Sequence, residues 1–170
     1  MSEPETLYKL MVLYMLKKVN FPLSIPQIWS FFEEKGYTNY FTFQTTVAQL
    51  EEANLLSEET VRNSVLLELT KEGEVALYYF INDISPAVRK DMDEYLTENK
   101  YQLRNETGVT ADYEKTEQYD YCVHGKVREG KDILFEMKVT VPTEDQARIM
   151  CDRFAENAQS IYAYVMKRSM

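Results

Sequence analysis

The chain has 170 residues, of which 45% are apolar, and it carries a net charge of −9. This length allows one compact domain or two small ones, and the apolar content is normal for a globular protein. The chain lacks the long apolar run of a membrane span and the basic start of a signal peptide, so we expect a cytoplasmic protein. The negative charge argues against nonspecific affinity for nucleic acid, because phosphate binding uses clustered Lys and Arg.

Helical periodicity dominates the first part of the chain. Residues 5–19 predict a first helix, and a second is expected between a Ser24 cap and Gly36. Several aromatic residues follow helical spacing here, and such stripes usually bury themselves. We therefore interpret these as core: Trp29, Phe31, Phe32, Phe41 and Phe43.

The segment 42–73 predicts a helix, a hairpin and the start of another helix. Apolar residues at helical spacing predict a helix that Thr42 caps and Asn54 closes. Residues 55–69 predict a hairpin with its turn at residues 62–64. A further helix over 70–82 follows Thr70. This order is that of a recognition helix, a wing and the helix after the wing.

Two phrases in this segment carry a resemblance. LEEANLL at 50–56 and LTKEG at 69–73 match phrases of bacterial winged helix-turn-helix regulators of the MarR and PadR groups. Residues 5 to about 82 resemble those regulators. The whole chain looks most like an uncharacterised bacterial family of unknown function whose members begin with a winged helix. That family resemblance implies a fold and no particular activity.

The regulator resemblance makes double-stranded DNA a candidate partner of the outer helix face and the wing tip. Amide side chains suit adenine edges, hydroxyls suit phosphate or thymine methyl groups, and the wing residues suit the minor groove or backbone. The candidate DNA-binding residues are Gln44, Thr45, Thr46, Gln49, Arg62 and Asn63. Against this interpretation, residues 36–61 contain no Lys or Arg, and residues 1–84 carry a charge of −6 compared with −3 for residues 85–170.

The second part of the chain changes its periodicity. A helix is expected after a Ser85 cap, followed by a polar loop over residues 99–108. Alternating residues then predict a small antiparallel sheet with a possible edge strand, at 111–116, 119–127 and 133–141.

A long helix ends the chain. Thr143 with Gln146 resembles a capping box, and the apolar stripe that follows covers a sheet or pairs with a second copy of itself. For a homodimer, the candidate contacts are Phe154, Ile161 and Val165. The predicted fold class is therefore α+β, with a winged-helix domain over residues 1–82 and an α+β domain over residues 83–170, in which a long C-terminal helix covers the sheet.

Catalytic motifs are absent. The sequence has no phosphate-binding loop, nucleophile elbow, zinc-protease motif or paired-cysteine spacing, so we expect no enzyme activity, no cofactor and no metal. His124 falls on the polar face of its strand, and Cys122 and Cys151 are interpreted as packed thiols.

Three hypotheses follow. The first is a homodimeric DNA-binding transcriptional regulator. The second is an adaptor whose acidic winged helix binds a protein partner without independent DNA binding. The third is a small-molecule sensor with a pocket under the last helix, lined by Tyr119, Tyr121, Phe135 and Met137.

Overall fold

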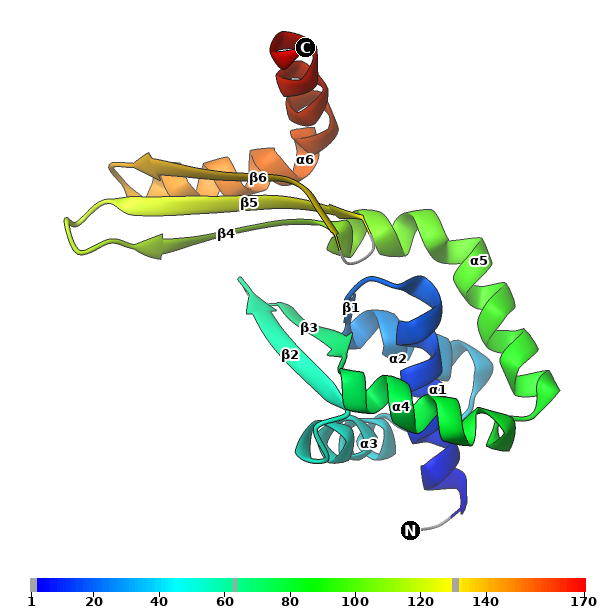
Figure 1. Cartoon of the computed structure of the whole chain (residues 1–170). Helices are drawn as coiled ribbons and strands as arrows, with labels where there is room; N and C mark the ends of the chain where they lie inside the picture. The colour runs from blue at the N-terminus through cyan, green and yellow to red at the C-terminus, as the bar shows by residue number, and fades with distance from the viewer. Residues whose placement is uncertain (1–2, 63, 130–131) are drawn as a thin grey trace.

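The computed structural model describes residues 3–62, 64–129 and 132–170 (Figure 1). The predicted α+β class is confirmed. The elements are α1 (Glu3–Val19), β1 (Leu23–Ser24), α2 (Ile25–Lys35), α3 (Tyr40–Glu52), β2 (Leu56–Val61), β3 (Ser64–Leu69), α4 (Lys71–Phe80), the 3-10 turn η1 (Ile81–Asp83), α5 (Pro86–Gly108), β4 (Val109–Lys115), β5 (Tyr121–Glu129), β6 (Asp132–Val141) and α6 (Glu144–Ser169).

The N-terminal lobe is built around α1. Every residue from Leu10 to Leu16 is buried, so this helix is apolar on all sides and lies in the centre of the lobe. The hairpin β2–β3 and the short strand β1 form an antiparallel sheet in the order β1-β3-β2. Strand β1 was not predicted, because two residues give no measurable periodicity; its pairing of Leu23 with Leu67 is a tertiary contact.

Most predicted helix ends are confirmed. Ser24 and Gln27 form a capping box at α2, and Gly36 ends that helix in the left-handed region with φ 70°. Asn54 closes α3 with φ 59°. The predicted start of α3 was wrong, because Asn39 is the cap: its side chain accepts from the Thr42 amide at 2.8 Å.

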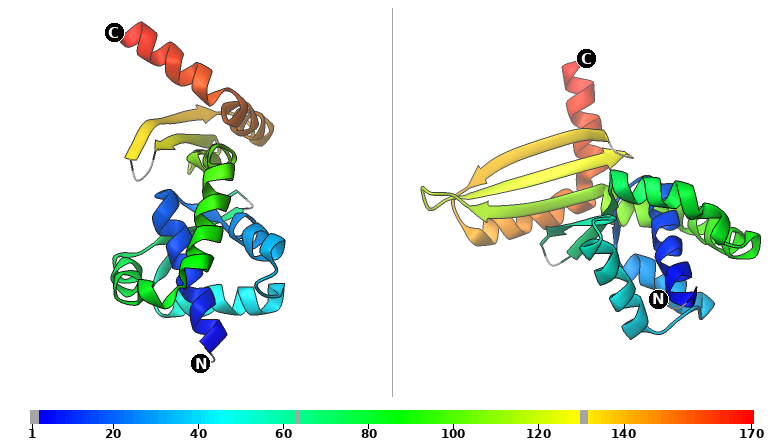
Figure 2. Two further views of the ribbon diagram at one scale, coloured as in Figure 1. Left: turned by 90° about the vertical axis from the view of Figure 1, so that its right-hand side faces the viewer. Right: turned by 60° about the horizontal axis from the view of Figure 1, so that its bottom comes forward.

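The predicted loop over residues 99–108 was also wrong, because α5 continues to Gly108. The segment is polar, yet most of its residues are good helix formers. Leu103 is buried in the N-terminal core, and the Gln27 amide donates to Glu106 at 2.6 Å. Tertiary contacts thus hold the extended helix, which leads from the N-terminal lobe to the second sheet (Figure 2).

The second sheet has the antiparallel order β4-β5-β6, with α6 across one face (Figure 1). Its core is a separate buried cluster that includes Val123, Ala147 and Phe154. Gly125 is required at the centre, because a Cβ there would lie 2.8 Å from the Phe154 ring. The predicted start of the middle strand at residue 119 was wrong, because Tyr119 precedes β5 in a turn with φ 70° and is exposed.

Within the described residues, none of the helices combines the length and apolar character that crossing a membrane requires.

Candidate nucleic-acid interface

Aromatic packing fixes the orientation of α3. The Trp29 ring of α2 lies 5.2 Å from the Tyr40 ring and 5.3 Å from the Phe43 ring, measured between centroids. Phe43, Val47 and Leu50 are buried, as their spacing predicted. The opposite side of α3 therefore faces solvent.

The candidate residues on α3 divide by exposure. Gln44 and Thr45 are exposed, and Gln49 is half-buried. Gln44 donates its side-chain amide to the Tyr40 hydroxyl at 2.5 Å, and the Thr45 hydroxyl donates to the Phe41 carbonyl at 3.1 Å. Both bonds are made to residues of the same helix at the surface. Either side chain can give up its bond and bind a ligand that contacts this face of α3.

Thr46 does not belong to this surface. It is only 2% exposed, and its hydroxyl donates to the Thr42 carbonyl at 2.8 Å. The helix turns this position inward next to Val47, so Thr46 is withdrawn as a DNA contact.

Phe41 also lies differently from the expectation. It is 82% exposed, whereas the aromatic stripe predicted a core position. Because the helix starts at Tyr40, Phe41 is helical and lies on the side opposite to Phe43. Recognising Asn39 as the cap would have revealed this from sequence.

The LTKEG phrase has a structural role at the base of the hairpin. The Thr70 hydroxyl donates to the Asn54 carbonyl at 2.8 Å and accepts from the Gly73 amide at 2.9 Å. A Cβ at Gly73 would lie 2.2 Å from the Leu55 carbonyl oxygen, so glycine permits the close approach. The phrase fastens α4 to the end of α3 and the start of the hairpin.

The exposed strand of the hairpin is acidic. Residues 57–60 of β2 face solvent and include Glu58 and Glu59. The pKa of Glu51 on α3 is raised to about 7 by burial and by the hydrogen bond and charge of Glu58. The surface between α3 and β2 thus places two carboxyl groups together, one of which takes up a proton near neutral pH.

The hairpin tip is held by the C-terminal lobe. Arg62, with φ 54°, donates from its guanidinium to Asp152 of α6 at 2.6 Å and from its backbone amide to Asp112 of β4 at 3.2 Å. Its side chain is thus occupied, and Arg62 is withdrawn as a DNA contact in this arrangement. Asn63 lies outside the described residues. Sequence reasoning missed Asp112 and Asp152, and no local pattern marks them.

The family comparison covers nearly the same span as the two lobes. The family described as a domain of unknown function (DUF4364) matches residues 8–168. The chain belongs to this family. Neither curated proteins nor solved structures yielded a significant match. The expectation of an uncharacterised family is confirmed, and membership of DUF4364 assigns no activity.

The three candidate dimer residues of this DUF4364 protein have different environments. Phe154 is 1% exposed and stacks on Phe135 with centroids 6.5 Å apart, so it belongs to the core of its own lobe and is withdrawn as a dimer contact. Ile161 is partly buried against the same core. Val165 lies on the exposed end of α6.

The residues predicted to line a sensor pocket do not converge. Tyr119 is exposed, Tyr121 packs on Tyr113, and Phe135 packs between Phe154 and Tyr162. Met137 alone of the predicted four lines the apolar groove beside α6. The other three residues predicted to line a sensor pocket lie elsewhere.

Proposed function

We propose that the protein is a cytoplasmic, winged-helix, DNA-binding transcriptional regulator that acts as a homodimer. The observation that supports this best is the exposure of Gln44 and Thr45 on α3, directly before a hairpin whose sheet has the order β1-β3-β2. In a winged helix, this helix enters the major groove and the hairpin forms the wing. Gln reads adenine edges, and Thr meets phosphate or a thymine methyl group.

A dimer is part of the proposal, because one such module binds weakly. Residues 36–61 supply no positive charge. Lys17 and Lys18, which could otherwise meet phosphates, lie 3.5 Å from Glu74 and 3.9 Å from Asp93. Two linked modules on a two-fold symmetric site raise affinity through effective concentration.

The test is a fluorescence anisotropy titration against fragments of the source genome at low and physiological salt. We expect the protein to bind a few fragments and to keep binding them at physiological salt. The affinity should fall only slightly with added salt, because few phosphates are neutralised. Gln44→Ala with Thr45→Ala should abolish the preference among fragments. Gln118→Ala, an exposed change in the other lobe, is the matched control. Equal binding by the double variant would refute this assignment.

A second function is favoured by a specific observation. Helix α3 exposes Tyr40 and Phe41 in its first turn, and the strand after it exposes Glu58 and Glu59, which suits a basic protein partner with apolar contacts better than it suits phosphate. In this adaptor alternative, the protein does not bind DNA even at low salt. A pull-down with the wild type captures a basic partner protein, and a pull-down with Phe41→Ser does not. Capture that is unchanged by Phe41→Ser would exclude this surface.

A further inference from the structure

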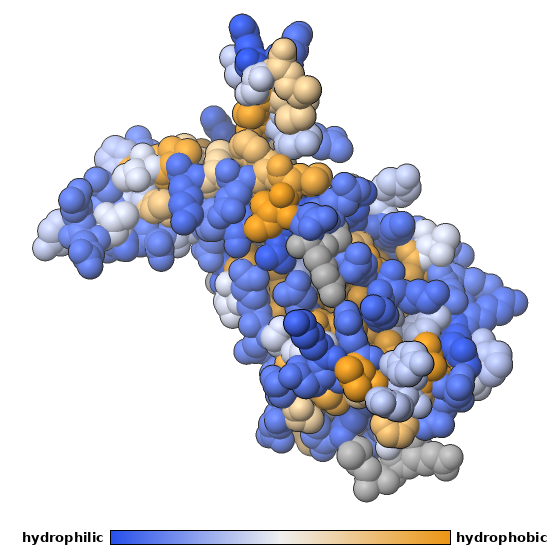
Figure 3. All heavy atoms as spheres, in the orientation of Figure 1, coloured by the Kyte–Doolittle hydropathy of each residue, from blue (hydrophilic) through white to orange (hydrophobic). Residues whose placement is uncertain are grey.

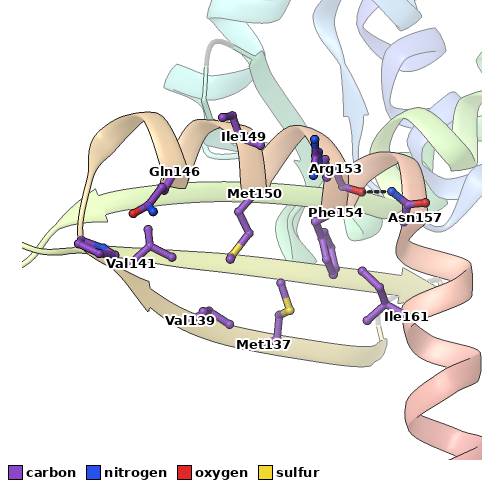
Figure 4. A pocket seen from close by; sticks show the side chains of 11 residues that line it. Met137, Val139, Val141, Gln146, Ile149, Met150, Arg153, Phe154, Asn157 and Ile161 are labelled. Carbon is purple, nitrogen blue, oxygen red and sulfur yellow. Dashed lines mark hydrogen bonds between the residues drawn. The ribbon is translucent and has the colours of Figure 1, made fainter.

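An apolar groove lies between the first part of α6 and strand β6 (Figure 4). Its volume is about 550 Å³. The helix packs mainly on β4 and β5 and makes fewer contacts with the edge strand β6, so the inner side chains of β6 before Val141 are only partly covered. The apolar lining of the groove includes Met137, Val139, Val141, Ile149, Met150 and Ile161, and the side chain of Arg153 also lines it.

The last part of α6 leaves the sheet. The helix changes direction and projects away from both lobes (Figures 1 and 2). Residues 163–170 are all exposed, whereas Ala147, Cys151 and Ala158 earlier in the helix are buried. Most helical stability in proteins comes from tertiary packing, and this exposed end receives little of it from the described residues. We call residues 162–170 the arm.

The arm nevertheless carries large apolar side chains. Tyr164 is 61% exposed, and Val165 and Met166 are also exposed. Figure 3 shows apolar surface on the projecting helix and at its base. An apolar helix end and an apolar groove thus occur in the same chain, and both face solvent.

We propose that the groove of each copy receives the arm of a second copy. The chain's own arm does not fill its groove, because Ile161 lines the groove at the point where the helix turns away (Figure 4). In a closed two-fold dimer, the arm of each copy occupies the groove of the other. Each copy then completes the cover over the partly buried inner face of its partner's β6.

Charge favours this occupant and its direction. The first turn of α6 carries Glu144 and Asp145, next to the Val141 end of the groove, and the arm ends in Lys167 and Arg168. An arm lying antiparallel to the partner's α6 brings its basic end to the partner's acidic turn. Within the chain, Asp145 meets Arg148 at 2.8 Å and Glu144 accepts from Tyr113 at 3.2 Å; both carboxylates are at the surface and retain further acceptor sites. The dipoles of the arm and of the partner's α6, lying antiparallel, also attract each other.

This inference deepens the dimer of the proposed function. Its test uses sedimentation velocity of the full chain without DNA, so failure of the dimer and failure of DNA binding are separate results. Ile149→Glu places a charge in the groove, and Tyr164→Gln with Val165→Gln removes the apolar side chains of the arm. All three positions are exposed. Val75→Gln, at an exposed apolar position on α4, is the matched control.

We expect the wild type and Val75→Gln to sediment as dimers at micromolar concentration. The groove variant and the arm variant, each folded by circular dichroism, should sediment as monomers. Mixing the two should restore a heterodimer, because the intact arm of one fits the intact groove of the other.

Two results would overturn the proposal. One is a monomeric wild type. The other is a folded groove variant or arm variant that still dimerises; if only the groove variant does so, the arms pair with each other.

Discussion

Arg62 at the tip of the β2–β3 hairpin and Asp152 on α6 are 90 positions apart in sequence, and their side chains meet at 2.6 Å. The contact joins the hairpin to the C-terminal lobe, and the Arg62 amide adds a second bond, to Asp112. A residue whose position predicts a DNA contact instead links the two lobes. For the proposed function, we therefore expect α3 to contact DNA either without the hairpin tip or after this ion pair opens.

A double-mutant cycle measures the strength of that link. The Arg62 and Asp152 side chains are 32% and 62% exposed, so solvent weakens their attraction. For Arg62→Ala, Asp152→Ala and the double variant, we expect a coupling of about 0.2–1 kcal/mol that falls with added salt. The measurement is urea denaturation. Strictly additive single effects at low salt would indicate that the tip is not held by this pair in solution.

Glu51 predicts a dependence of stability on pH. Its pKa rises from the ordinary 4.5 to about 7 in the folded state, through burial and then through Glu58. The folded state thus binds more protons between these values, and the free energy of unfolding falls as pH rises through this window.

Glu51→Gln should remove that component, so the variant gains stability over the wild type at pH 8. Denaturation across the pH range checks this, with Glu52→Gln at the neighbouring exposed position as the control. A wild-type profile that matches that of Glu51→Gln would contradict the raised pKa.

The contact between Gly125 and Phe154 predicts overpacking. Gly125→Ala should destabilise the protein by about 1–3 kcal/mol, because its Cβ would meet the Phe154 ring at 2.8 Å. Phe154→Leu also destabilises, yet the double variant should lose less than the sum of the two because the smaller side chain gives room. Thermal denaturation measures these losses of unfolding free energy. If they are additive, the strand has relaxed away from the Phe154 ring.

The Thr70 hydroxyl should contribute to stability at the base of the hairpin. Its hydroxyl caps α4 and also bonds to the Asn54 carbonyl. Thr70→Val should therefore lose about 1 kcal/mol or somewhat more of unfolding free energy. Thr60→Val, on the exposed strand β2, serves as the control. Equal stability of the two variants would count against the joint role of the hydroxyl.

The local features of the fold were readable from residues close together in sequence. Ser24, Gly36, Asn54 and Thr143 mark helix ends as predicted, because a cap depends on amides or carbonyls within one turn. The two longer strands of the second sheet followed from alternation. The errors arose where a local rule had a competitor: Asn39 caps α3 before Thr42, and Leu103 extends α5 through a polar segment by packing on the core.

The sequence by itself thus determined the α+β class, the order of the helices and of the strands other than β1, and the outward side chains Gln44 and Thr45, because periodicity reports which face of an element is buried. Only the tertiary structure decided which candidate residues are available. Arg62 is engaged by residues 50 and 90 positions away, and Phe154 fills the space above Gly125. Such pairings depend on how two lobes meet in space, and no pattern within a single element records them.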